Sequence, residues 1–529
     1  MRYLLAFVLA ITCCAQVVVV KHRSGSTVAQ PTDTNSGGSC TGSSPTWTCT
    51  GAPTITLTDA TGGAAQCYRT DGVTITVVTA GTCPSGSTTY STPFAGPGST
   101  FTLTSVGTEI GYTTSSQLSS AYTIVPAQSK SKLMVSAITT VKTATRWFSV
   151  MGNDTTMFSV ENVDPMPVAG NFRKMYAVLL TDPDSAASSN GYTFTLRKNG
   201  VATAATVTIL SSTSSFEASY AGADVHFAAG DLVDYEQDVV GSPANAPLAS
   251  FIIEFQSDSG GGYYKTILTS GIKGASLTAT GAQFLSAFGQ LAQNATEGNT
   301  YTVVPMAGTI TSFSSQLTTV PGTSNSRTFT IRQTSGGSTS SVGTAITYSA
   351  AQNGVHTQTQ SISVAAGDLI DYQEDVTGTP ATSKAGFSLV FEPTTGGQFI
   401  IPSSYPLGSI LSASATRYVG LSVGAGAVET TEANAKQVVT ADFSLNGWTA
   451  WLDVSPGGSG KTYTVDLRRN AGAPSVTYST GITAGGVTSS ASTSYSIVAN
   501  WDLLDTRVVP SSTPTAAHMV ISYVGYIAP

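Results

Sequence analysis

The stretch AAGDLVDYEQD at Ala228–Asp238 returns almost unchanged as AAGDLIDYQED at Ala365–Asp375, and a degraded third copy, VANWDLLD, occupies Val498–Asp505. Both full copies follow alternating polar and apolar residues, which is typical of a half-buried strand. Gly-Asp then favours a turn, because glycine tolerates positive φ and aspartate accepts hydrogen bonds from the nearby backbone. The phrase therefore predicts a strand–turn–strand corner built on Gly230, Asp231, Gly367, Asp368 and Asp502.

Other patterns recur with this corner, so the chain is predicted to be an array of one β-domain. A strand that ends in arginine and runs into a turn occurs at Tyr192–Gly200, Thr328–Gly337 and Tyr463–Gly472. The first of these turns is Asn199-Gly200, and Asn-Gly between alternating runs is the strongest short-range signal of a β-hairpin. Apolar closing strands follow at Ala249–Phe255, Ala385–Phe391 and Met519–Val524. The spacing of roughly 135 residues suits one sandwich domain per copy.

Strand, hairpin, corner and closing strand, in this order, resemble a jelly-roll sandwich of the tumour-necrosis-factor/complement type. The resemblance implies an all-β chain with three tandem jelly-roll-like repeats, at 133–258, 262–393 and 397–529. Because each repeat is long enough to fold alone, we expect separate beads joined by linkers near Ser257–Gly262 and Glu392–Gly397. Domains of this kind often trimerise, so an oligomer is an open alternative.

The N-terminus predicts export. Met1-Arg2 precedes the apolar run Tyr3–Ile11, and Cys13-Cys14-Ala15 offers a small-residue cleavage site, so residues 1–15 are predicted to be a signal peptide. A lipoprotein anchor at Cys13 or Cys14 is a weaker alternative. No later stretch reaches the roughly 18 consecutive apolar residues of a membrane helix. We therefore expect a secreted protein, extracellular or at the cell surface, with no membrane span.

Four cysteines follow the signal peptide, at positions Cys40, Cys49, Cys67 and Cys83. In an oxidising compartment an even, clustered set predicts disulfides. We expect nearest neighbours to pair, Cys40 with Cys49 and Cys67 with Cys83, although two other connectivities are open. A zinc site is disfavoured because no histidine lies among them.

Residues 53–125 follow a Gly/Ser/Thr-rich lead-in at 16–52 and predict a small sandwich of short strands. The order CYRTDG at 67–72, STTYSTPF at 87–94 and SSAYTI at 119–124 resembles the chitobiase/hexosaminidase C-terminal-type module. That family consists of immunoglobulin-like accessory domains of secreted bacterial proteins. The chain departs from its pattern at Val73, where a proline is expected after the Asp-Gly turn. The resemblance implies a spacer or adhesive module that is not catalytic.

Composition and motifs disfavour nucleic-acid binding and catalysis. The net charge is −7 and only 10% of residues are charged, whereas ordinary domains have about 25% and nucleic-acid binders carry clustered lysine and arginine. The sequence holds no nucleophile elbow, zinc-protease motif or phosphate loop. We therefore expect no enzyme, no nucleic-acid partner, no cofactor and no resident metal.

The acidic cluster of the repeated phrase is the best candidate for a site. Asp231, Asp234 and Asp238 match Asp368, Asp371 and Asp375, but the fourth carboxylate shifts from Glu236 to Glu374. Alternation along a strand puts these two glutamates on opposite faces, which disfavours a shared catalytic role. We interpret the first aspartate as a turn cap. A calcium site is the open alternative.

Together these patterns predict a secreted, non-enzymatic, four-domain surface or adhesion protein. Tryptophans could supply a sugar platform, but Trp448 and Trp451 lie three apart on a strand, so one of them is expected in the core. The expected partner is an extracellular polymer or cell-surface glycan, bound weakly and multivalently. Two alternatives are open: a polysaccharide hydrolase carrying the accessory module, and a virion fibre or capsid-type protein.

Overall fold

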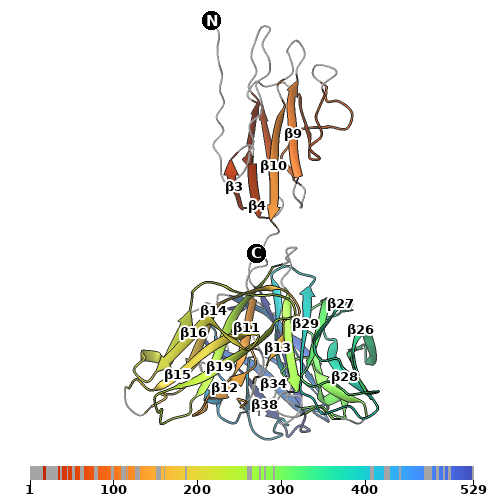
Figure 1. Ribbon diagram of the computed structural model, residues 1–529. Helices are drawn as coiled ribbons and strands as arrows, with labels where there is room; N and C mark the ends of the chain where they lie inside the picture. The colour runs from red at the N-terminus through yellow and green to blue at the C-terminus, as the bar shows by residue number, and fades with distance from the viewer. Residues whose placement is uncertain are drawn as a thin grey trace. The chain divides into compact units, whose positions relative to one another are not determined.

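The chain folds into two compact units (Figure 1), Met1–Gln128 with Ser259–Gly261, and Ser129–Asp258 with Gly262–Pro529. The structure is a computed structural model, and it describes residues 16–19, 34–35, 39–43, 46–50, 54–59, 65–76, 82–96, 101–108, 115, 117–125, 132–150, 157–159, 161, 163–184, 188–258, 265–272, 276–278, 281–289, 292–404, 410–421, 429–439, 443–469, 479–483, 488–491, 495–497 and 502–526. Across these ranges the elements are β-strands and short 3-10 turns, which confirms the all-β fold class. The predicted signal peptide at 1–15 lies outside them.

The first unit is a sandwich of two sheets. Its strands are β1 (Gln16–Val19), β2 (Thr34–Asn35), β3 (Ser39–Ser43), β4 (Thr46–Thr50), β5 (Thr54–Asp59), β6 (Ala65–Arg69), β7 (Thr88–Thr89), β8 (Phe94–Ala95), β9 (Phe101–Thr108) and β10 (Leu118–Val125). One sheet joins β1, β5, β2 and β8, and the other has the order β3-β4-β10-β9-β6-β7. Ile55 and Leu57 of β5 pack in one buried cluster with Leu103 and Tyr122 of the other sheet. Cys67 and Cys83 form the predicted disulfide.

The segment 16–52 is not the linker that we expected. Its strands β3 and β4 belong to the larger sheet, and β4 pairs in parallel with β10. Strand β1 pairs with β5 directly after the predicted cleavage site. The register sets Cys40 opposite Cys49, while their side chains lie outside the described part of the chain, so that disulfide stays a prediction.

The second unit contains three sandwiches that repeat one plan. The first consists of β11 (Lys132–Thr140), β12 (Arg146–Phe148), β13 (Asp164–Pro165), β14 (Gly170–Leu179), β15 (Gly191–Lys198), β16 (Val201–Leu210), η1 (Ser214–Phe216), β17 (Glu217–Tyr220), β18 (Val225–Phe227), β19 (Leu232–Val240) and β20 (Leu248–Ser257). The second consists of β21 (Thr266–Ile272), β22 (Gln283–Ser286), η2 (Glu297–Asn299), β23 (Thr302–Val303), β24 (Gly308–Leu317), β25 (Ser326–Ser335), β26 (Ser338–Ser349), β27 (Gly354–Val364), β28 (Leu369–Thr377) and β29 (Ala385–Pro393). The third consists of β30 (Gln398–Ser404), β31 (Arg417–Gly420), η3 (Glu432–Asn434), β32 (Gln437–Val439), β33 (Phe443–Leu452), β34 (Thr462–Arg469), β35 (Ser479–Ile482), β36 (Thr488–Ala491), β37 (Tyr495–Ile497), β38 (Asp502–Ser511) and β39 (Met519–Tyr526).

Each repeat has the strand order of a jelly roll. In the first repeat one sheet runs β11-β20-β14-β17 and the other β12-β19-β15-β16, so the closing strand lies beside the opening one. The corresponding orders are β21-β29-β24-β27 with β22-β28-β25-β26, and β30-β39-β33-β36 with β31-β38-β34-β35. Two packed antiparallel sheets whose neighbouring strands are mostly distant in sequence are the arrangement of a jelly roll.

The hairpin between β15 and β16 follows the Asn-Gly signal. Asn199 and Gly200 both have positive φ, 52° and 77°, as a tight two-residue hairpin turn requires. Gly336 and Gly337 take the same place between β25 and β26, with φ of 57° and 81°. Short-range turn chemistry therefore sets the register of these strands.

The three sandwiches pack against one another and close a ring of contacts. The short strand β13 of the first repeat contacts β29 of the second, and β23 of the second contacts β39 of the third. Strand β32 of the third repeat contacts β20 of the first and completes the cycle. The interpretation of the repeats as separate beads is therefore wrong, because all three share one compact unit.

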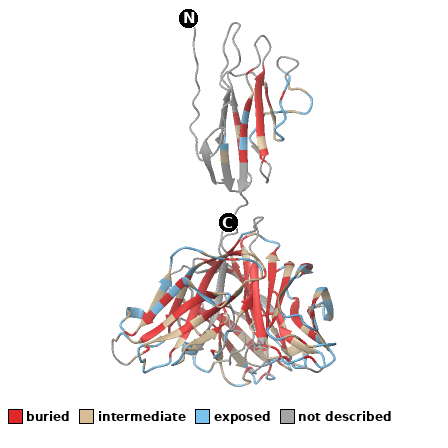
Figure 2. Ribbon diagram, in the orientation of Figure 1, coloured by how far each residue is buried: buried red, intermediate tan, exposed pale blue. Residues whose placement is uncertain are grey.

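The closing strands are buried along nearly their whole length, which explains this association (Figure 2 draws buried residues in red). Ile252 of the first repeat belongs to the hydrophobic cluster of the third, and Val524 of the third belongs to that of the second. Ile267 of the second repeat joins the cluster of the first. Each sheet therefore packs one face inside its own sandwich and the other against a neighbour, so these residues gain burial only when the ring forms.

Gly386→Ala should destabilise the second unit by about 1–3 kcal/mol, as expected of overpacking. A Cβ at Gly386 would lie 2.8 Å from the carbonyl oxygen of Val163 in the first repeat, which is backbone and cannot rotate away. Urea denaturation gives the free energy of unfolding. Gly458→Ala is the control, because a Cβ there meets nothing within 4 Å. Equal midpoints for the two variants would contradict the role of the interface.

Candidate functional site

The two full corners are turns capped by their own aspartates. Gly230 and Gly367 have φ of 89° and 92°, the left-handed region that favours glycine. The carboxylate of Asp231 accepts the backbone N–H of Ala228 at 2.7 Å, and that of Asp368 accepts the N–H of Ala365 at 2.8 Å. The side chain of Asp502 lies outside the described residues.

Each corner aspartate also binds the strand that leads to the neighbouring hairpin. Asp231 accepts a hydrogen bond from Asn199 at 2.7 Å and pairs with Lys198 at 3.0 Å, and Asp368 accepts one from Gln333 at 2.7 Å. Burial acts to raise the pKa of Asp231, but hydrogen bonds from Asn199, Lys198 and Ala228 together lower it. The charge of this carboxylate is thus used to hold the corner against the hairpin.

A second acidic position of the phrase is buried beside an arginine in every repeat. Arg197 lies opposite Asp234 in the register, Arg332 opposite Asp371, and Arg468 opposite Asp505. All three aspartates are buried, with exposed fractions of 0%, 1% and 0%. The arginine comes from the strand before the hairpin and the aspartate from the strand after the corner, so both sequence signals meet at one place.

A glutamate completes each of these charge clusters. The guanidinium groups of Arg197, Arg332 and Arg468 pair with Glu161, Glu297 and Glu432 at 2.7, 2.8 and 3.1 Å. Sequence reasoning missed these glutamates. A usable signal was present, since a glutamate followed within two residues by asparagine precedes the short strand in each copy.

Burial raises the pKa of two of these aspartates, Asp371 and Asp505. It raises the pKa of Asp371 well above its usual range, with a further contribution from nearby Glu297, although Thr300 donates a hydrogen bond that opposes the shift. Burial and Glu432 raise the pKa of Asp505 to about 7 in spite of Arg468. These groups therefore favour the neutral form, as desolvation of a carboxylate requires.

The glutamates of the phrase have different partners in the two full copies. Glu236 is partly exposed and pairs with Arg197 at 3.2 Å, whereas Glu374 is fully buried and pairs with Arg327. At the corner, Asp231 pairs with Lys198 and accepts a hydrogen bond from Asn199, so its partners differ from that of Glu236. Within the described residues no group of three or more His, Cys, Asp or Glu could hold a metal ion. These contacts cross-link neighbouring strands.

The tryptophans of the array do not form a platform in the described region. Trp448 is 2% exposed in the core of the third repeat, and Trp451 packs against Tyr301 of the second with ring centroids 5.4 Å apart. Trp147 lies beneath the guanidinium of Arg197. Trp501 falls outside the described residues.

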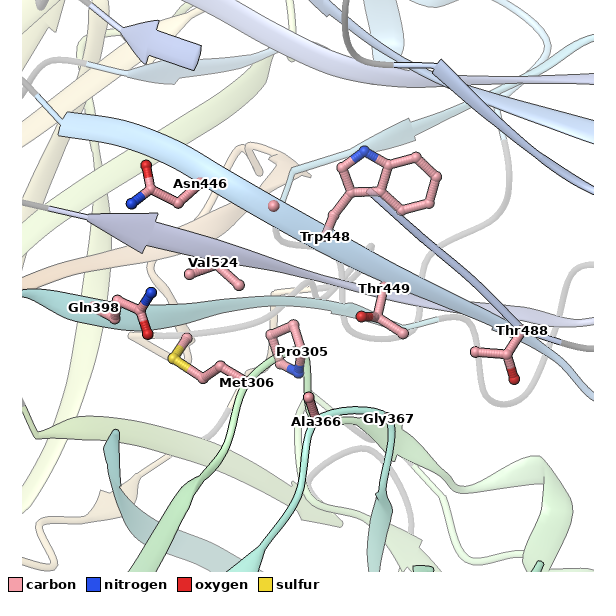
Figure 3. Close-up of a pocket in the computed structure, with 11 residues that line it drawn as sticks. Pro305, Met306, Ala366, Gly367, Gln398, Asn446, Trp448, Thr449, Thr488 and Val524 are labelled. Carbon is pink, nitrogen blue, oxygen red and sulfur yellow. The ribbon is translucent and has the colours of Figure 1, made fainter. Parts of the chain in front are cut away.

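A cavity of about 420 Å³ lies between the second and third repeats (Figure 3). From the second repeat, Ala366 and Gly367 of the corner and the segment Pro305-Met306 line it. From the third repeat, residues of β30, β33, β36 and β39 form the other side. One corner of the repeated phrase therefore borders a space that exists only because the repeats associate.

The chain has no match among the known families and curated proteins with which it was compared. The resemblances to the chitobiase-type module and to the tumour-necrosis-factor/complement type stay predictions. The described residues contain no helix long and apolar enough to cross a membrane.

Asp505→Asn should flatten the pH dependence of stability. The folded state holds the Asp505 proton up to about pH 7, whereas the unfolded chain releases it near pH 4. The folded state thus binds more protons, and stability falls as pH rises between these values, at most by about 1.4 kcal/mol per pH unit for one group. Asparagine stays neutral and removes this slope.

Urea midpoints across that pH interval measure the effect. Asp375→Asn serves as the control, because Asp375 is an exposed carboxylate of the same phrase. An Asp505→Asn variant with the wild-type slope would show that this aspartate is ionised in the folded protein.

Proposed function

We propose that the chain is a secreted, non-enzymatic surface or adhesion protein that binds an extracellular polymer through the three-repeat unit. The observation that carries the proposal is the use of the repeated carboxylates. Asp231 and Asp368 cap turns, and Asp234, Asp371 and Asp505 lie buried next to arginines. The repeated carboxylates, which a hydrolase would need as catalytic acid and base, thus have structural roles, and this favours a binding function over catalysis.

The ring arrangement supports multivalent attachment. Three related sandwiches held in fixed contact offer repeated surfaces in one molecule, so a polymer bound at one repeat is held near the others. A chain with only 10% charged residues suits a neutral polymer, because binding requires the desolvation of few ions. The disulfide of the first unit is in keeping with an oxidising compartment.

Co-sedimentation of the mature protein with insoluble chitin, cellulose and peptidoglycan tests the proposal. We expect saturable binding to at least one polymer, lost after thermal unfolding, because the binding surface is made by the folded ring. Reducing sugar is measured in the same supernatants and should stay at background. Time-dependent release of reducing ends would favour the hydrolase, and absence of binding to any polymer would overturn the adhesive role.

A further inference from the structure

We propose that the cavity between the second and third repeats binds a neutral saccharide unit. The proposal rests on the proposed function, because it assigns the sugar of the bound polymer to one site. The volume of about 420 Å³ lies within the range of small-ligand sites, roughly 300–1,000 Å³. Its walls come from two repeats, so it is present only in the associated unit.

A glycine lines the cavity at a position where the preceding interface has a serine. At the preceding interface Ser312, the residue after the bulge in β24, donates a hydrogen bond to the carbonyl of Pro167 at 3.3 Å. The residue after the corresponding bulge in β33 is Gly447, which faces the matching segment at Pro305. Glycine has no side chain to fill the gap, so the cavity opens at this interface.

The side chains that line the cavity indicate which class of ligand it can bind. Hydrogen-bonding side chains come from Gln398, Asn446, Thr449 and Thr488, and none of the described lining residues is charged. Amides and hydroxyls both donate and accept, as a row of sugar hydroxyls does. A phosphate, carboxylate or ammonium ligand would lose its hydration without meeting an opposite charge. A neutral polyhydroxylated ligand therefore fits best.

Apolar atoms complete the match. Met306 and Val524 lie on the lining of the same cavity and can cover the C–H face of a sugar ring. The indole of Trp448 points to the opposite side of β33, into the core of the third repeat, so no ring of this residue stacks on the ligand (Figure 3). Recognition by hydrogen bonds and small apolar contacts predicts weak affinity at a single site, which multivalency strengthens.

Saturation-transfer NMR on the full mature chain tests the site with N-acetylglucosamine, galactose and mannose as probes and galacturonate as the charged counterpart. At least one neutral probe should bind, and galacturonate should not. Ala366 is exposed and lines the cavity, so Ala366→Trp should obstruct it and weaken binding by about ten-fold or more. Thr449→Val, which removes one hydroxyl at nearly constant shape, should weaken it by roughly 2- to 10-fold.

The matched control is Ala229→Trp, the same substitution at the exposed, corresponding corner position of the first repeat. Its Kd for the probe should lie within about two-fold of the wild-type value. The change expected for Ala366→Trp is ten-fold, which corresponds to about 1.4 kcal/mol. Wild-type affinity in Ala366→Trp, or no binding of any neutral probe, would overturn the site. Polymer sedimentation of the same variants separates the two proposals. If the protein binds a polymer but Ala366→Trp binds the neutral probe like wild type, only the cavity proposal is overturned. If a neutral probe binds but no polymer does, only the adhesive function is overturned.

Discussion

The second unit depends on one packing contact that is made three times: a short strand of each repeat lies on the closing-strand sheet of the next. Strands β13, β23 and β32 supply this contact to β29, β39 and β20. The interface is of the heterologous kind, in which one surface meets a different surface of its neighbour, and such contacts form a closed ring when the rotation is right. Covalent linkage of the copies makes each association intramolecular and so favours closure.

This contact accounts for the composition of the closing strands. In β20, β29 and β39 nearly every residue is buried, although antiparallel sheets commonly leave one face to water. Gly386 shows how close the approach is, because a Cβ at this position would lie only 2.8 Å from the carbonyl oxygen of Val163. Apolar area and close backbone approach together make the interfaces resemble a domain core.

Charges are few in this protein, and many of those in the repeats hold strands together. The arginine, glutamate and aspartate clusters join the hairpin strand to the corner strand in each sandwich. Removing the glutamate from such a cluster would leave the mostly buried guanidinium with less compensation, which would destabilise the sandwich. The corner of the second repeat, at Ala366 and Gly367, borders the cavity between the second and third repeats.

The amino-acid sequence alone determined the local structure: the strands, the hairpin at Asn199-Gly200, the corners at Gly230 and Gly367, and the opposite faces of Trp448 and Trp451. These features follow from alternation and from φ preferences, which act over a few residues. The tertiary structure decided the ring, the glutamate partners of the arginines and the cavity. The sequence around an apolar residue such as Ile252 looks the same whether the side chain packs inside its own sandwich or against a neighbour. In the same way, Gly447 borders a cavity only because the fold brings Pro305 of another repeat to the same place. These contacts join residues that are far apart in the sequence, so the local sequence pattern does not reveal them and only the folded chain brings the partners together.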